Sequence, residues 1–468
     1  LLKNQKLYMD NDATNVTDNG KSKFIYGLDG PMTIWHEESS DDNDIIVNSD
    51  GSGGDRVYAY FGMRRGGDNY YAMNVTDRDD PQLMWTIFGP NNSTPTGGFS
   101  DLGQTWSEPK LQKVLWGCGT SCDPTNPAHI KDVLFFAGGY DPIHDTATSP
   151  TTGDKGAAIY MVDAEDGSLL WSAGNSNSSD THNLELQMEN SIPGDLTVAD
   201  INGDGAADIL FAIDILGHIW RIDFNREDTS LSSFASGGEI ADLSDSSAFR
   251  RFYVGPTVSL SQKRGRAPFF VITVGSGYMA HPIDETPHPS KDRVYAIFDK
   301  HVFSPEKDSS DNPIYTLIDT SELADVTELT STPADPATNT GFYKEATTKG
   351  EKFLRRAITQ QGITVYTSYI PDGETVTTNN DCGTAQLGSS RLFAIDFVTG
   401  ASLYTTQYKD LKHPGIASEP VTLLIPSEND NSIKKVLCIG TECFGPDDDE
   451  NPFGEVTTQI LYWRENLQ

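Results

Sequence analysis

Short apolar segments separated by turns rich in Asp and Gly recur along the whole chain. The clearest copy is an apolar strand at 159–163, a turn through Asp166 and Gly167, and a second strand at 168–171 that ends in Trp171. An Asp-Gly pair supplies the backbone freedom that a tight hairpin requires. Because no helical period of any length accompanies these segments, the pattern predicts paired β-strands.

Further copies of this hairpin are spread over the sequence. They lie at 71–74 with 83–85, at 218–223, at 295–299, and at 393–396 with a turn at 399–400. Apolar strands precede the copies at 57–61, 133–137, 209–213, 269–274 and 363–367. Weaker units at 24–35 and at 436–438 with 457–463 bring the number of units to about seven.

This repetition predicts an all-β fold, a modified β-propeller of seven irregular blades with long loops. A unit of roughly 65 residues exceeds the roughly 40 to 50 residues of a four-stranded blade, so the surplus is assigned to loops. The polar stretches assigned to loops are 37–54, 91–100, 141–155, 330–340 and 427–432. A β-sandwich array is the alternative that irregular periods also allow.

The tryptophans that close repeats are expected to pack between strands rather than to bind a ligand. They are Trp35, Trp85, Trp171, Trp220 and Trp463. We expect residues 1–468 to form a single propeller domain. The chain starts Leu1-Leu2-Lys3, with neither Met nor a signal peptide. We interpret it as the C-terminal region of a longer secreted protein whose N-terminal domain is absent.

Charge and hydropathy exclude two classes of binding partner for this chain. The chain has 34 Lys and Arg against 68 Asp and Glu, a formal net charge of -34. This balance excludes an electrostatic grip on nucleic acid or on an anionic membrane. No run approaches the roughly 18 apolar residues of a membrane span, so we expect no transmembrane segment.

The five cysteines fall into two close pairs and one single residue. Cys118 and Cys122 form one pair, Cys438 and Cys443 the other, and Cys382 stands alone. The spacings predict two small loop disulfides, as suits a protein outside the cell. Five free thiols are the alternative, and zinc is disfavoured because neither pair has C-x2-C spacing.

One motif carries clear chemistry, the segment 200–208 with the sequence DINGDGAAD. Oxygen ligands at alternate positions curl around a hard cation, and Gly205 at the sixth position allows the sharp turn. The predicted Ca²⁺ ligands are Asp200, Asn202, Asp204, the carbonyl of Ala206, and Asp208. Phe211 stands where an EF-hand would need a bidentate Glu, so the motif is interpreted as a calcium loop flanked by strands.

Other candidate sites are weaker. The stretch 48–55 has a calcium-like composition, but its Gly density is typical of a loop, and the acidic run 447–450 is typical of a solvated turn. The sequence has no G-x-S-x-G, H-E-x-x-H or G-x-x-x-x-G-K motif, and the nine His are scattered singly. We therefore predict no catalytic residue, no bound organic cofactor and no enzymatic activity.

Several motifs together resemble the PilC/PilY-type tip-associated adhesins of type IV pili, whose C-terminal half is a modified β-propeller. The matching pieces, in chain order, are 26–31, 66–67 with 70–77, 102–109, 138–141, the calcium loop with Asp214, Gly217, 220–221 and Asp223, then 367–371, Cys382 and 415–420. Each piece alone is weakly specific. Their collinear order over nearly the whole chain is what carries the resemblance.

The resemblance implies a function that spacing alone does not show. Members of that family sit at the pilus tip with minor pilins, prime pilus assembly and oppose retraction in a calcium-dependent way. They also support adhesion to a receptor, twitching motility and virulence. The resemblance thus implies an extracellular location at the tip of the fimbrium, with outer-membrane association as a second placement. The receptor, on a host or another surface, is unidentified.

Two departures and two rivals qualify the resemblance. Some relatives carry an Arg-Gly-Asp integrin-binding triplet, whereas this chain has only Arg65-Gly66-Gly67-Asp68, and the variable N-terminal half of the family is absent. The segment 160–171 also resembles blades of quinoprotein dehydrogenases, which hold a pyrroloquinoline cofactor with calcium. The chain has no adjacent Cys-Cys pair against which such a cofactor could pack. The calcium loop is also similar to FG-GAP repeats of integrin-like propellers, which carry several copies where this chain has one.

Overall fold

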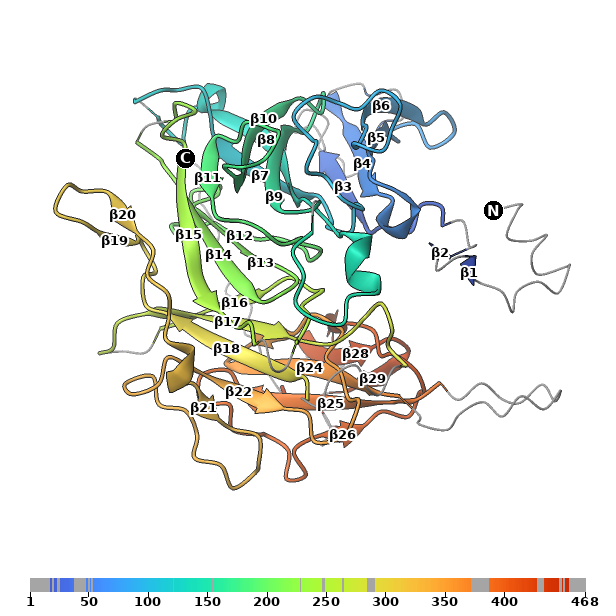
Figure 1. The fold of residues 1–468 in the computed structure, drawn as a ribbon, viewed down its shortest axis with the longest axis vertical. Helices are drawn as coiled ribbons and strands as arrows, with labels where there is room; N and C mark the ends of the chain where they lie inside the picture. The colour runs from blue at the N-terminus through green and yellow to red at the C-terminus, as the bar shows by residue number, and fades with distance from the viewer. Residues whose placement is uncertain are drawn as a thin grey trace, which may run out of the picture. The chain divides into compact units, whose positions relative to one another are not determined.

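The structure is a computed structural model, drawn in Figure 1. It describes residues 17–18, 21–22, 26–37, 48, 51, 54–120, 122–153, 155–227, 229–245, 249–262, 265–283, 291–371, 387–426, 433–445, 448 and 451–453. The chain divides into two compact units. Unit 1 is Leu1–Ser246 with Phe303–Leu317, and unit 2 is Ser247–Val302 with Ile318–Gln468. Whether the two form one domain stays a prediction.

Unit 1 holds three larger sheets and two short hairpins among its described residues. The sheet orders are β3-β4-β5-β6, β11-β10-β9-β8-β7 and β12-β13-β14-β15, and the hairpins are β1-β2 and β19-β20. The strands are β1 (Thr17–Asp18), β2 (Lys21–Ser22), β3 (Met32–Glu37), β4 (Arg56–Gly62), β5 (Tyr70–Asn74), β6 (Gln82–Ile87), β7 (Lys110–Leu115), β8 (Ile130–Ala137), β9 (Ala158–Asp163), β10 (Leu169–Asn175), β11 (Leu184–Leu186), β12 (Thr197–Ala199), β13 (Ile209–Ile213), β14 (His218–Phe224), β15 (Ala235–Asp242), β19 (Glu306–Lys307) and β20 (Pro313–Ile314). Short 3-10 turns lie at η3 (Arg64–Gly66), η4 (Pro127–His129) and η5 (Pro142–Asp145).

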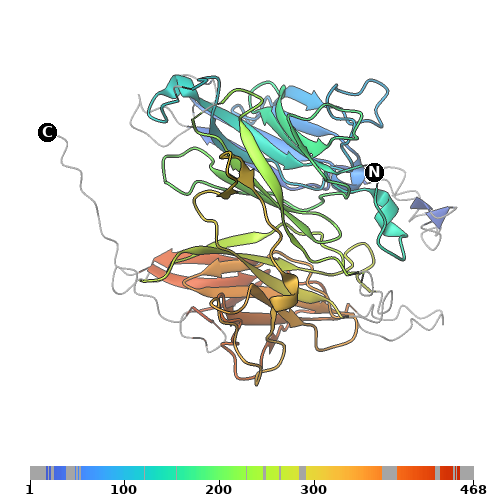
Figure 2. The same ribbon diagram turned by 60° about the vertical axis from the view of Figure 1, so that its left-hand side comes forward.

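Unit 2 holds three sheets among its described residues, drawn from yellow to red in Figure 2. Their orders are β16-β17-β18-β22-β21, β23-β24-β25-β26 and β27-β28-β29. The strands are β16 (Thr257–Ser261), β17 (Phe269–Gly275), β18 (Arg293–Asp299), β21 (Ala324–Asp325), β22 (Gly341–Glu345), β23 (Ile358–Gln360), β24 (Ile363–Ile370), β25 (Ser389–Asp396), β26 (Lys409–Asp410), β27 (Pro420–Pro426), β28 (Ile433–Ile439) and β29 (Glu442–Phe444), and one 3-10 turn is η6 (Thr320–Glu322).

The predicted hairpins are present. The clearest copy forms β9 and β10, where Leu169 pairs with Val162. Gly167 in their turn has φ 73°, a left-handed conformation that glycine adopts without steric cost. The all-β fold class is thereby confirmed, whereas the blade number of seven is not. Part of the seventh predicted unit, 457–463, lies outside the described residues.

Buried aromatic residues fill the space between sheets, as the spacing of the tryptophans predicts. Trp171 and Trp220 are 1% and 3% exposed and share one core cluster in unit 1, while Trp35 and Trp85 share another. Trp463 lies outside the described residues. In unit 2, the rings of Tyr366 and Phe393 stack at 4.9 Å within its core.

Both predicted disulfides are present, Cys118 with Cys122 and Cys438 with Cys443. Cys382 lies outside the described residues, as does the predicted loop 427–432. The predicted loops 91–100, 141–155 and 330–340 hold no strand in their described residues. Within the described part of the chain, no helix has the length and hydropathy needed to cross a bilayer.

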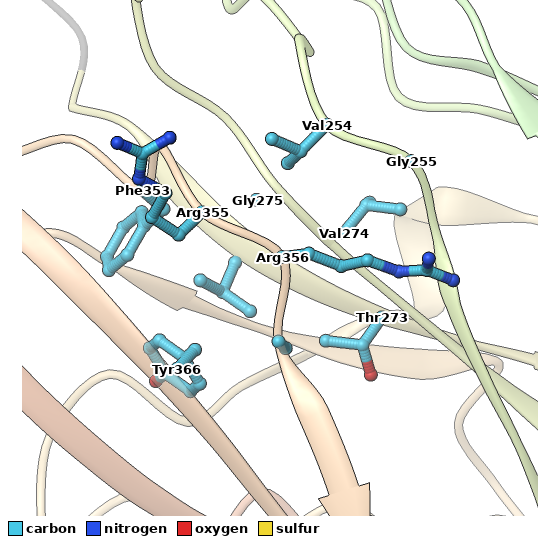
Figure 3. A pocket seen from close by; sticks show the side chains of 11 residues that line it. Val254, Gly255, Thr273, Val274, Gly275, Phe353, Arg355, Arg356 and Tyr366 are labelled. Atoms are coloured by element: carbon cyan, nitrogen blue, oxygen red, sulfur yellow. The ribbon is translucent and has the colours of Figure 1, made fainter. Parts of the chain in front are cut away.

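A small cavity lies inside unit 2, lined by residues of β17, β18 and the segment 353–357 (Figure 3). Its volume is about 10 Å³, room for about one water molecule. Arg355 donates from Nε to the carbonyl of Ala417 at 2.9 Å, and Arg356 donates to the carbonyl of Pro256 at 2.7 Å. Because both guanidinium groups are held by backbone carbonyls, we assign this space to packing.

Candidate metal site

The predicted calcium loop connects β12 to β13 at one end of the sheet β12-β13-β14-β15, drawn in green in Figure 1. Ala199 pairs with Ile209 where the two strands meet the loop. The backbone of Asp208 is held on both sides, since its N–H donates to Ala199 at 2.9 Å and its carbonyl accepts from Phe224 at 2.9 Å. The sheet therefore fixes the last predicted ligand in place.

Backbone N–H groups of the loop form hydrogen bonds to its side-chain oxygens. One oxygen of Asp200 accepts from the N–H of Gly203 and the other from the N–H of Gly205, both at 2.7 Å. Gly203 and Gly205 have φ of 78° and 87°, which favours glycine at both positions. The two glycines therefore let the chain bend around the first carboxylate.

The remaining side chains repeat this arrangement. Asn202 Oδ1 accepts from the N–H of Asp204 at 2.9 Å, and Asp204 Oδ1 accepts from the N–H of Ala206 at 3.1 Å. Asp208 Oδ2 accepts from the N–H of Ile201 at 2.8 Å. The structure thus brings the four predicted side-chain ligands into one loop, with Ala206 between them.

The sequence prediction missed one member of this group, Arg226. Its guanidinium forms ion pairs with Asp204 and Asp208. Arg226 lies two residues beyond the end of β14, and β14 pairs with β13 so that Asp223 lies opposite Ile209. The pairing of β13 with β14 therefore brings Arg226 to the loop. The predicted strands at 209–213 and 218–223 could have indicated this contact, because a hairpin between them places the residues after the second strand beside the loop before the first.

Burial and like charge both act on the loop carboxylates. Burial raises the pKa of the Asp208 carboxyl, and repulsion from Asp200 and Asp223 raises it further, although the N–H groups of Ile201 and Asn202 act in the opposite direction. Burial also lowers the pKa of the Arg226 guanidinium. A group of carboxylates under such repulsion gains from any cation that is placed among them.

The donor set fits a hard divalent cation. Three carboxylates, one amide oxygen and one backbone carbonyl in nine consecutive residues are the oxygen ligands that Ca²⁺ prefers. The carboxylates of Asp200, Asp204 and Asp208 do not form a group whose ligand atoms all lie within 4.8 Å of one another, so an ion would have to draw them closer together. The guanidinium of Arg226 pairs with both Asp204 and Asp208, so an ion in contact with both carboxylates would have to displace it.

The weaker candidates gain little from the structure. Asn48 donates from its backbone N–H to Asp55 at 2.7 Å and from its side chain at 3.0 Å, which closes a turn. Of the run 447–450, only Asp448 is described, and it accepts from the N–H of Gly445 at 2.7 Å. Both contacts suit turn formation.

One histidine makes contacts that resemble a catalytic triad. His182 lies 3.0 Å from Ser172 Oγ through Nδ1 and 2.9 Å from Asp101 through Nε2. Ser172 is 1% exposed and the side chain of His182 is also 1% exposed, so no substrate reaches the hydroxyl. Whether the chain has a catalytic residue stays a prediction.

Comparison with known proteins gives relatives for this fold. No family profile matches the chain. A type IV pilus biogenesis factor PilY1 of Pseudomonas aeruginosa strain UCBPP-PA14 is 30% identical over 201 residues, 41% of this chain and 13% of that protein. PilY1 of strain PAK is 24% identical over 255 residues, 53% of this chain and 18% of that protein. The match thus spans less than a fifth of the length of these relatives.

A solved structure covers more of the chain. The crystal structure of the Pseudomonas aeruginosa PilY1 C-terminal domain superposes with a TM-score of 0.56 at 16% identity, covering 89% of this chain and 83% of that domain. At this identity the superposition shows a shared fold only. The chain is therefore similar to PilY1 in sequence over part of its length, and to the PilY1 C-terminal domain in fold.

Proposed function

We propose that this chain is the propeller part of a calcium-binding, tip-associated biogenesis factor and adhesin of type IV pili. In this role the protein supports pilus assembly, surface adhesion and twitching motility, and it opposes retraction. Its partners would be minor pilins at the tip and a surface receptor of a host or another substrate. It would act outside the cell at the pilus tip.

The observation that carries this proposal is the match to proteins named type IV pilus biogenesis factors, at 30% and 24% identity. The described fold supports it, because the chain covers 83% of the solved PilY1 C-terminal domain. The matched part is a small share of each relative, so the pilus role of the whole protein belongs to this proposal.

We propose Ca²⁺ as the ion of the loop 200–208, with Asp200, Asn202, Asp204, the Ala206 carbonyl and Asp208 as ligands. An ion there would neutralise carboxylates whose mutual repulsion otherwise opposes the folded loop. Through Asp208 the ion would also brace β12 and β14, because the backbone of Asp208 bonds to Ala199 and Phe224. The loop would thereby couple calcium to the rigidity of one sheet.

A binding and assembly role is favoured over an enzymatic one. Ser172 and His182 are buried, and the sequence has no G-x-S-x-G, H-E-x-x-H or G-x-x-x-x-G-K motif. The single strong calcium loop in the sequence also favours the pilus role over an FG-GAP-like module with repeated loops.

The experiment is deletion of the gene in the organism that carries this chain, followed by complementation with the wild-type gene or with Asp204→Ala. We expect the deletion to lose surface pili and twitching. We expect surface pili to return when the retraction motor is also inactivated, because the protein is proposed to oppose retraction. The wild-type gene should restore both properties.

The variant separates the calcium part of the proposal from the pilus part. Asp204→Ala should be secreted at the wild-type level but should fail to restore twitching. Normal piliation and twitching in the deletion strain would contradict the pilus role. Full activity of a variant that has lost calcium binding would contradict only the calcium part.

A further inference from the structure

A second group of metal-ligating side chains lies at the other end of the same sheet. His218 is the first residue of β14, and Glu239 and Asp242 lie on β15. One ligand atom from each of the three lies within 4.8 Å of the others. The calcium loop meets β13 at Ile209, whereas this group lies beyond the other end of β13, across the turn 214–217. The two groups are therefore separate sites.

A β-bulge gathers the three residues on one face. His218 pairs directly with Asp242, and Trp220 pairs with Glu239, with a shift in register between the two pairs. Regular alternation would place Glu239 and Asp242, three residues apart, on opposite faces. The bulge at Ile240 removes one step of that alternation, so Glu239 turns to the face of His218 and Asp242.

Buried groups hold the imidazole of His218 in a fixed orientation. Its Nδ1 lies 2.7 Å from Asp214 Oδ2, and Asp214 is 1% exposed. Asp214 Oδ1 accepts from the N–H groups of Leu216, Gly217 and His218 at 2.9 to 3.0 Å. A carboxylate that accepts a hydrogen bond from Nδ1–H leaves Nε2, once it has lost its own proton, as the ligand atom, which is the usual support for a metal-binding histidine.

The spacing of the outer atoms suits a tetrahedral ion. His218 Nε2 lies 3.6 Å from Asp242 Oδ1, longer than a hydrogen bond. Two ligands at about 2.0 to 2.2 Å from a tetrahedral metal lie roughly 3.3 to 3.6 Å apart. A ligand atom of Glu239 lies within 4.8 Å of the other two, so its carboxylate would have to approach them for all three to bind one ion.

A neighbouring indole lacks an acceptor. Trp220 is 3% exposed, shares the face of His218 and lies opposite Glu239. Within the described residues its Nε1 has no hydrogen-bond partner. A buried donor without a partner is costly, and an ordered water would be one acceptor for it.

We propose that His218, Glu239 and Asp242 form a second metal site, which binds a divalent transition-metal ion of the zinc class with Asp214 as the support of His218. One imidazole and two carboxylates leave a fourth position for water or for a ligand from another molecule. The imidazole distinguishes this site from the all-oxygen calcium loop. The site is independent of the proposed pilus function.

The experiment uses the chain stripped with chelator and then held in saturating Ca²⁺, so that the loop 200–208 is filled. Zn²⁺ is titrated by calorimetry, and Co²⁺ is titrated in parallel while its visible absorption is followed. We expect one ion per chain and a cobalt spectrum of tetrahedral intensity. Asp204→Ala should bind Zn²⁺ and Co²⁺ as the wild type does.

The matched variants are Glu239→Gln and Glu185→Gln, which make the same change on β15 and at an exposed position on β11. Glu239→Gln should weaken Zn²⁺ binding at least about 10-fold, whereas Glu185→Gln should leave it unchanged. Equal affinity in wild type and Glu239→Gln, no binding below millimolar Zn²⁺, or loss of binding in Asp204→Ala would each overturn the proposal. Wild-type melting of Glu239→Gln in chelator would show that the variant is folded.

Discussion

The two ends of the sheet β12-β13-β14-β15 carry acidic groups that are assembled in opposite ways. At one end, the calcium loop takes all its predicted ligands from residues 200–208. At the other end, His218, Glu239 and Asp242 come from two strands and depend on a bulge. A contiguous loop needs only its own turn, whereas the second group exists only if β14 and β15 pair in this register.

Each end also places a protein cation among its carboxylates, and the two cations differ. Arg226 pairs with Asp204 and Asp208 at the loop end, and its guanidinium stays charged at any physiological pH. His218 pairs with Asp214 at the opposite end, and its charge depends on pH. The loop end should therefore respond to calcium and the histidine end to pH.

The largest expected effect is loss of the loop ion. Asp204→Ala should lower calcium affinity by at least about 1,000-fold, about 4 kcal/mol, because it removes one of three carboxylates. In Ca²⁺ at about 100 times the dissociation constant, the wild type should gain about 2.7 kcal/mol of stability that the variant lacks. Calorimetry and thermal unfolding measure the two quantities.

Chelator provides the control for this variant. Without calcium, wild type and Asp204→Ala should unfold at similar temperatures, because the ion whose stabilisation differs is gone. Equal melting curves of wild type and Asp204→Ala in saturating calcium would contradict the assignment of the loop 200–208 as a calcium site.

The second effect is a pH dependence at the histidine end, measured in chelator. Burial lowers the pKa of His218, but the hydrogen bond to Asp214 and the charges of Asp214, Asp242 and Glu239 outweigh burial and raise it to about 9. A folded pKa above the unfolded value near 6.5 stabilises the protein fully below pH 6.5. This stability, up to about 3 kcal/mol, should be lost as the pH rises through 9.

Urea unfolding between pH 6 and pH 10 measures this loss. His218→Gln should be less stable than the wild type at pH 6 and should approach it at pH 10. If the free energy of unfolding of the wild type stays constant between pH 6.5 and pH 9, and the variant shows the same profile, the expected charge on His218 is contradicted.

The smallest expected effect comes from the competition between Arg226 and the calcium ion for the carboxylates of the loop. Arg226→Gln should raise calcium affinity about 3- to 10-fold, because an ion then no longer displaces a guanidinium from Asp204 and Asp208. Partly exposed ion pairs are worth about 1 kcal/mol or less each, which sets that range. Arg78→Gln removes the same charge at an exposed position and should leave the affinity unchanged. Weaker binding in Arg226→Gln would mean that the arginine supports the ion instead.

The sequence predicted those parts of the fold whose signal is local. The strands that became β4, β8, β13 and β17 contain hydrophobic runs of four or more residues, and the Asp-Gly turn between β9 and β10 favours a hairpin by itself. The outer strand β15 was missed, because its sequence ASGGEIAD has neither an apolar run nor alternation. It is a strand because β14 offers a partner for its backbone, and Gly238 leaves room for Tyr315, whose ring atoms would lie within 3.0 Å of any Cβ there.

The sequence by itself therefore determined the all-β class, the two disulfide pairs and the loop 200–208, since each depends on residues close together in the chain. Only the tertiary structure decided that Arg226 reaches that loop and that Glu239 and Asp242 share a face with His218. The physical reason is that strand register and bulges set which distant side chains meet, and a shift of one residue moves a side chain to the opposite face of the sheet.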